Sequence, residues 1–172
     1  LGIQWFCAAG NGDNAGGHLP VPRDLAAPGD CPEPVYGGGG HTAVITITAT
    51  DAADAVSSMA SGGPTAWALA DPPAYGDYPY PPGLVKPDLA APGVAVTSTV
   101  GVSGYASYTG TSMATPLAAA AGAILLQARP NLSPEQIAAA LTGGAVDLGA
   151  AGRDNQSGAG RLDVPAALAL LP

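Results

Sequence analysis

Short apolar runs, separated by breaks rich in glycine and proline, set the pattern of this chain. Residues 2–9 form a nearly continuous apolar run, which predicts a strand of a parallel sheet covered on both faces. Residues 43–49 form a second run that is rich in β-branched side chains, and this also predicts a strand. Shorter strand patterns cover residues 94–97 and 104–110.

The second half of the chain carries helical patterns. Residues 117–126 are apolar on every side and rich in strong helix formers, so they predict a helix that is buried all round. Ser133 opens a capping box for a helix that runs to about Leu141. Asp163 is expected to cap a last short helix over residues 164–171. Strands that alternate with helices indicate an α/β layered sheet.

Two long surface loops are expected, at about residues 12–42 and 65–85, where glycine and proline gather. With 172 residues, the chain is long enough for one domain with a core of its own. The aromatic side chains of the second loop would either contact a substrate or hold the loop in place, and we favour the second interpretation. These side chains are Trp67, Tyr75, Tyr78 and Tyr80.

The strongest chemical signal is a hydroxyl at the entrance of the predicted helix 117–126. Ser112 lies there, within the segment Gly110-Thr111-Ser112-Met113-Ala114-Thr115-Pro116. Backbone N–H groups at a helix N-terminus are unpaired and attract negative charge, so an oxyanion formed next to Ser112 would be stabilised. The ordinary alternative is that Ser112 only caps the helix.

This segment resembles the nucleophile motif of the subtilisin-like serine proteases, the subtilases. Three further stretches match that family in the expected order. Residues 6–11 resemble the strand that ends in the oxyanion-hole asparagine, here Asn11. Residues 86–94 resemble the entrance of the strand that precedes the nucleophile, and residues 158–163 resemble the closing segment. The resemblance implies a three-layer subtilisin-like α/β sandwich with a mainly parallel sheet, of which residues 1–172 would be the C-terminal part.

The resemblance also implies a function and a set of roles. The family hydrolyses peptide bonds through an acyl-enzyme, which would form here on Ser112. The side-chain amide of Asn11 and the backbone N–H of Ser112 would hold the oxyanion, with Thr111 supporting that site. The wall and floor of the specificity pocket would be small and uncharged. They correspond to Ala8, Ala9, Gly10 and Gly29.

The family's triad order is Asp, His, Ser, and the first two motifs are not found in this chain. His18 and His41 both follow Asn11, whereas the family histidine precedes it, so neither is assigned a catalytic role. We expect the base and its carboxylate to lie in an N-terminal part of the catalytic domain, which would be a partner of this chain. The alternative is a non-catalytic module that acts in binding. An esterase elbow is discounted because Ala114 stands where that motif needs glycine.

Composition excludes some classes of partner. The chain has 13 acidic and 5 basic residues and a net charge of −8, which argues against nucleic-acid binding. The apolar run 117–126 is about half the length of a membrane span, so no membrane partner is expected and the resemblance implies secretion. No cofactor is required. Asp88 falls near a weak cation site of some family members, which suggests a structural calcium ion, but a plain strand-entry residue is the interpretation we favour.

The only two cysteines are Cys7 and Cys31, and their spacing is not that of a metal site. They could form one disulfide in a secreted protein. The interpretation we favour is that Cys7, on an apolar strand, is a small core residue.

Overall fold

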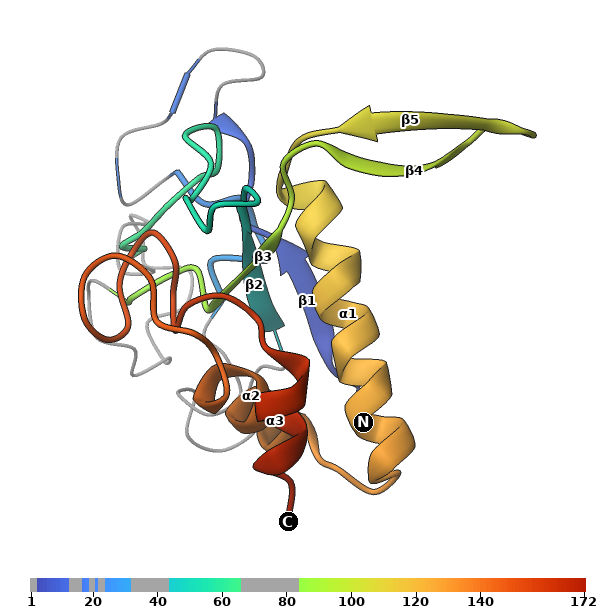
Figure 1. The fold of residues 1–172 in the computed structure, drawn as a ribbon. Coiled ribbons are helices and arrows are strands. Elements are labelled where there is room, and N and C mark those ends of the chain that lie inside the picture. The colour runs from blue at the N-terminus through green and yellow to red at the C-terminus, as the bar shows by residue number, and fades with distance from the viewer. Residues whose placement is uncertain (1–2, 13–16, 19–20, 22–23, 32–43, 66–83) are drawn as a thin grey trace.

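A short parallel sheet lies at the centre of the computed structural model. In the part of the chain that is described, the sheet has the strand order β1-β2-β3, with β1 at Trp5–Ala8, β2 at Val44–Thr50 and β3 at Leu89–Pro92 (Figure 1). The parallel strands predicted near residues 2–9 and 43–49 are therefore confirmed. The structure describes residues 3–12, 17–18, 21, 24–31, 44–65 and 84–172.

The two faces of β2 have different chemistry. Ile45, Ile47 and Ala49 face one way and join the hydrophobic core. The threonines that alternate with them are equally inaccessible to solvent and face the other way, because successive side chains of a strand point to opposite faces. These are Thr46, Thr48 and Thr50. The helices pack on the apolar face, and on the opposite face Thr46 bonds the carbonyl of Gly29.

Three helices in the described part of the chain share the core with the apolar face of β2. They are α1 (Thr111–Ala128), α2 (Pro134–Gly143) and α3 (Val164–Ala169). The capping box of Ser133 is present at the start of α2, and Asp163 caps α3 by accepting a hydrogen bond from Ala166 N at 2.9 Å. Both cap predictions are confirmed, and α3 ends two residues earlier than expected.

The prediction that the first helix is buried all round is wrong for this chain. Only one face of α1 packs on the sheet, so Ala114, Ala118 and Leu125 are buried while Leu117 is 40% exposed and Ile124 is 44% exposed. By length and composition alone α1 is also able to cross a membrane, a test that core helices of soluble proteins often pass as well. The sequence of α1 is apolar on every side, and this composition does not reveal that only one side of the helix is packed against the rest of the chain.

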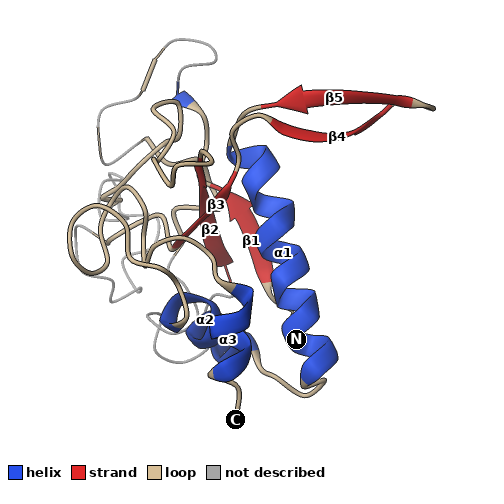
Figure 2. Ribbon diagram, viewed as in Figure 1, coloured by secondary structure: helices blue, strands red, loops and turns tan. Residues whose placement is uncertain are grey.

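The first strand also differs from its prediction. The sequence predicts that β1 is covered on both faces, but Trp5 is 58% exposed and the other three residues of the strand are only partly buried. β1 also lies at an edge of the described sheet. A separate antiparallel hairpin of β4 (Val96–Val100) and β5 (Gly104–Tyr108) projects away from the sheet and leads into α1 (Figure 2). Its first strand begins two residues later than expected. The four loop aromatics, residues 67–80, and His41 lie outside the described residues.

Candidate active site

Ser112 is the second residue of α1, and its side chain is exposed, whereas Thr111 and Ala114 of the same turn are buried. The residue that caps the helix is Gly110, with φ 156°, and no side chain bonds the cap. The interpretation of Ser112 as a helix cap is therefore wrong. Among the described residues, the Ser112 hydroxyl has no hydrogen-bond partner, so its oxygen is open to an incoming molecule.

The end of β1 meets the start of α1 through a fully buried threonine. Thr111 N donates to Asn11 Oδ1 at 3.0 Å, and Thr111 Oγ1 lies 3.2 Å from both Asn11 Oδ1 and Gly10 O. Gly10 N donates to Thr111 Oγ1 at 3.3 Å. These bonds connect residues about a hundred positions apart and place Asn11 beside the first turn that carries Ser112.

This contact determines which end of the Asn11 amide remains available. A backbone N–H can only donate, so the atom that faces Thr111 N must be the amide oxygen. The Nδ2 group of Asn11 then has no hydrogen-bond partner among the described residues. Two unpaired donors, Asn11 Nδ2 and the first-turn N–H of Ser112, come from adjoining segments. Such a pair can stabilise negative charge that develops on an oxygen.

The four predicted substrate-contact residues lie on two adjoining segments. Ala26 N donates to Ala9 O at 2.9 Å, which lays the segment 24–31 along the end of β1. Gly29 is buried and fits closely there, because a Cβ on it would lie 3.2 Å from Ala8 O. Gly10 has φ +112°, a conformation that favours glycine. Ala9 is fully buried, and its N–H and carbonyl already bond Ile47 O and Ala26 N, so neither its side chain nor its backbone is free to meet a ligand.

His18 connects two loop segments through its contacts with Asp24 and Ser58. Its Nδ1 lies 3.0 Å from Asp24 Oδ2, and its Nε2 lies 2.8 Å from Ser58 O. Asp24 Oδ2 also accepts from Gly62 N at 2.9 Å. No described hydrogen bond joins His18 to Ser112.

The two cysteines are thiols and are both half-buried. Burial raises the pKa of the Cys7 thiol above its ordinary value. Burial, followed by the nearby charge of Asp30, raises the pKa of the Cys31 thiol to about 11. Both groups are therefore protonated at neutral pH and are weak nucleophiles.

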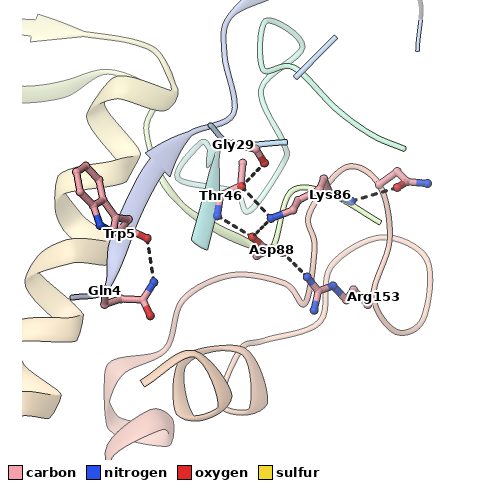
Figure 3. A network of polar contacts seen from close by, with 8 residues as sticks. Gln4, Trp5, Gly29, Thr46, Lys86, Asp88 and Arg153 are labelled. Atoms are coloured by element: carbon pink, nitrogen blue, oxygen red, sulfur yellow. Dashed lines mark hydrogen bonds and ion pairs between the residues drawn. The ribbon is translucent and has the colours of Figure 1, made fainter. Parts of the chain in front are cut away.

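Sequence reasoning missed a buried polar network next to Gly29 (Figure 3). Lys86 Nζ lies 2.5 Å from Asp88 Oδ2, which also accepts from Thr46 N at 2.7 Å, while Arg153 bonds the other carboxylate oxygen. The side chains of Lys86 and Asp88 are fully buried. The sequence does carry a signal for this network, because Lys86 is the only lysine of the chain and lies just before the apolar strand β3.

This network also bears on the calcium interpretation of Asp88. Both carboxylate oxygens of Asp88 already bond cationic side chains, which leaves them poorly placed to bind a metal ion. Within the described ranges there is no group of three or more His, Cys, Asp or Glu side chains that could hold a metal.

Comparisons with known protein families and sequences agree with one another: each finds similarity to subtilases or to extracellular proteases and subtilisins. A family model described as the subtilase family matches residues 2–160. The chain is 46% identical over 71 residues to the minor extracellular protease Vpr of Bacillus subtilis, covering 38% of this chain and 9% of that protein. It is 45% identical over 80 residues to subtilisin Savinase of Lederbergia lenta, covering 46% of this chain and 29% of that protein.

A solved structure agrees on the fold. The prenylagaramide maturation protease PagA superposes with a TM-score of 0.70 at 20% identity, covering 99% of this chain and 51% of that protein. The likeness confirms the predicted α/β fold of the subtilisin type. The chain thus spans about half the length of this structural neighbour, and its matched stretches span smaller shares of the curated relatives.

Proposed function

This chain belongs to the subtilase family, and from that premise we propose that it carries the nucleophile and the oxyanion-binding groups of a serine endopeptidase. Ser112 Oγ attacks the carbonyl carbon of a peptide bond. The oxyanion that forms accepts hydrogen bonds from Ser112 N–H and Asn11 Nδ2. Collapse of this intermediate breaks the C–N bond: the proton of the Ser112 hydroxyl, taken up by a general base, passes to the leaving amine. This leaves an acyl-enzyme on Ser112, which water then hydrolyses.

The observation that carries this proposal is the pair of hydrogen bonds from Thr111 to the side-chain oxygen of Asn11. Thr111 holds the Asn11 amide oxygen from two atoms, the backbone N and Oγ1. The orientation of the amide is therefore set before a substrate arrives. A donor that is already oriented needs no reorganisation when charge develops, which is why such groups lower the barrier.

The substrate is proposed to be a protein or peptide whose side chain, next to the cleaved bond, lies between two small-residue segments. One is Ala8-Ala9-Gly10 at the end of β1 and the other is Ala27-Pro28-Gly29. Neither carries a charge in its side chains, so an uncharged side chain fits best.

The general base and its carboxylate are proposed to come from an N-terminal part of the catalytic domain, either as a further segment or as a separate polypeptide. Such a part would cover the exposed apolar face of α1, with Leu117 and Ile124, and the edge of the described sheet at Trp5. The protein is further proposed to be secreted, since its relatives include proteases named as extracellular. It needs no cofactor for this chemistry.

A second candidate is a binding module without catalysis. It is favoured by the state of Ser112, whose hydroxyl has no base within hydrogen-bond distance among the described residues. A serine without a base is a weak nucleophile, so a chain in this state would hold peptides without cleaving them.

Labelling with a fluorophosphonate separates the two candidates. The full-length protein that contains these residues is treated with the probe, digested and examined by mass spectrometry. The protease proposal expects the label on Ser112 and none on the Ser112→Ala variant. Failure to label Ser112 in a protein that still binds peptides would favour the binding module.

A further inference from the structure

A chain of polar contacts links the buried lysine to the segment that contains Gly29 (Figure 3). Lys86 Nζ lies 3.1 Å from Thr46 Oγ1, and Thr46 Oγ1 lies 2.5 Å from Gly29 O. Lys86 and Thr46 are both fully buried, and Gly29 is buried as well. Water is therefore not available to replace either contact.

The direction of the two hydrogen bonds follows from the proton count. The Lys86 ammonium has donors only, so Thr46 Oγ1 must accept from it. The hydroxyl has a single proton, which it then donates to the Gly29 carbonyl. Asp88 keeps the ammonium in place because its Oδ2 atom binds Lys86 Nζ. The charge of Lys86 thereby orients the Thr46 proton toward Gly29.

Gly29 has little room to move once this bond is made. A Cβ on Gly29 would lie 3.0 Å from Thr46 Cγ2 and 3.2 Å from Ala8 O. The Gly29 backbone is thus packed between β2 and the end of β1, with Thr46 supplying both the contact surface and the hydrogen bond. A shift of Gly29 would change the separation between the two proposed substrate-contact segments.

We propose that Thr46, oriented by Lys86, is a positioning residue that sets the location of Gly29 and with it the side-chain specificity of the site. The proposal rests on the proposed function, because specificity here means a choice among peptide substrates. Thr46 touches neither the substrate nor the reacting atoms, and it acts only through the carbonyl of Gly29.

The chain offers a matched pair of substitutions for the test. Thr46→Val removes the hydroxyl and keeps the side-chain shape. Thr48→Val is the control, since Thr48 lies on the same face of β2, is also fully buried and has a hydroxyl without a hydrogen-bond partner. Variants of Lys86 are less informative, because removal of one buried charge leaves Asp88 with an incomplete set of partners and endangers folding.

The first measurement compares two peptide substrates that differ only in the residue before the cleaved bond, alanine or phenylalanine, in the full-length protein. We expect Thr46→Val to change the ratio of their kcat/KM values about fivefold, the equivalent of one hydrogen bond, mainly through KM. Thr48→Val should leave the ratio unchanged, and Thr46→Ser, which keeps the hydroxyl, should restore it. A purely structural role would lower the titratable fraction of enzyme and leave the ratio per active site unchanged.

The second measurement does not need activity. Hydrogen exchange is followed in residues 24–31, where Gly29 N donates to Ala26 O at 2.8 Å. We expect faster exchange in Thr46→Val than in Thr48→Val. Equal exchange in the two variants, or an unchanged substrate ratio in an active enzyme, overturns the proposal. A wild-type protein without peptidase activity refutes the proposed function instead, and exchange then decides alone whether Thr46 positions Gly29.

Discussion

At the scale of single residues, Thr111 joins the two parts of the candidate site. Thr111 is fully buried, and its N–H and hydroxyl both lie within hydrogen-bond distance of Asn11 Oδ1. The same hydroxyl also accepts from Gly10 N and lies within hydrogen-bond distance of Gly10 O. A buried polar group without partners is costly, so these bonds favour one arrangement of the strand end and the helix start. The placement of Asn11 next to Ser112 is thus a property of the packed interior.

The first prediction concerns Asn11. Asn11→Ala removes the Nδ2 donor, and we expect kcat of the full-length protein to fall about 10²–10³-fold, as for other single oxyanion donors, with KM nearly unchanged. That pattern marks a bond that forms mainly in the transition state. Steady-state kinetics on a peptide substrate provide the measurement. Asn11→Asp keeps an acceptor for Thr111 but no donor, so it should lose activity as well; wild-type kcat in either variant would contradict the assignment.

At the scale of elements, the closing segment is attached directly to β3. Ala90 N donates to Gly160 O at 2.8 Å and Leu162 N donates to Ala90 O at 2.8 Å. Gly158 has φ +65°, and a Cβ on it would lie 2.3 Å from the carbonyl carbon of Asp88. The segment approaches β3 so closely that no side chain fits at Gly158.

The second prediction compares two glycines in that region. Gly158→Ala should lower the free energy of unfolding by about 3 kcal/mol or more, because the methyl group overlaps backbone atoms. Gly152→Ala is the control: its φ is +83° but open space surrounds its Cβ position, so only the cost of the left-handed conformation remains, about 1 kcal/mol. Urea denaturation of both variants gives the comparison. Equal losses in stability would show that the closing segment moves aside.

At the scale of the whole molecule, apolar surface remains on one side. Ile3 and Trp5 are more than half exposed near the sheet edge, and Leu117 and Ile124 are exposed on α1. An open strand edge and an apolar helix face both favour association. Their burial would require further polypeptide, which agrees with a chain that spans about half of its structural neighbour.

The third prediction follows from this surface. Residues 1–172 produced alone should associate, and addition of the proposed N-terminal part should give a defined complex; light scattering with intact mass measures both. Ile124→Lys should weaken self-association because it charges the exposed face of α1. Val102→Lys is the control, since Val102 is fully exposed in the hairpin turn, away from that face. A monodisperse monomer that melts cooperatively would contradict the proposed interface.

Local signals in the sequence by themselves determined several parts of this protein. The capping box at Ser133 and the cap at Asp163 involve residues three positions apart, so their pattern predicts the helix starts correctly. The β-branched run that became β2 and the motif around Ser112 are likewise contained within a few residues. Such features depend on neighbouring residues and can be recognised without knowledge of the fold.

Only the tertiary structure decided how these parts meet. The contact of Asn11 with Thr111 and the contact of Lys86 with Thr46 join residues that are 100 and 40 positions apart. The exposed side of α1 likewise depends on which layers surround the helix and not on its own composition. Periodicity and motif spacing describe one segment at a time. The partner of a buried charge or of an apolar face is determined only when distant segments pack together.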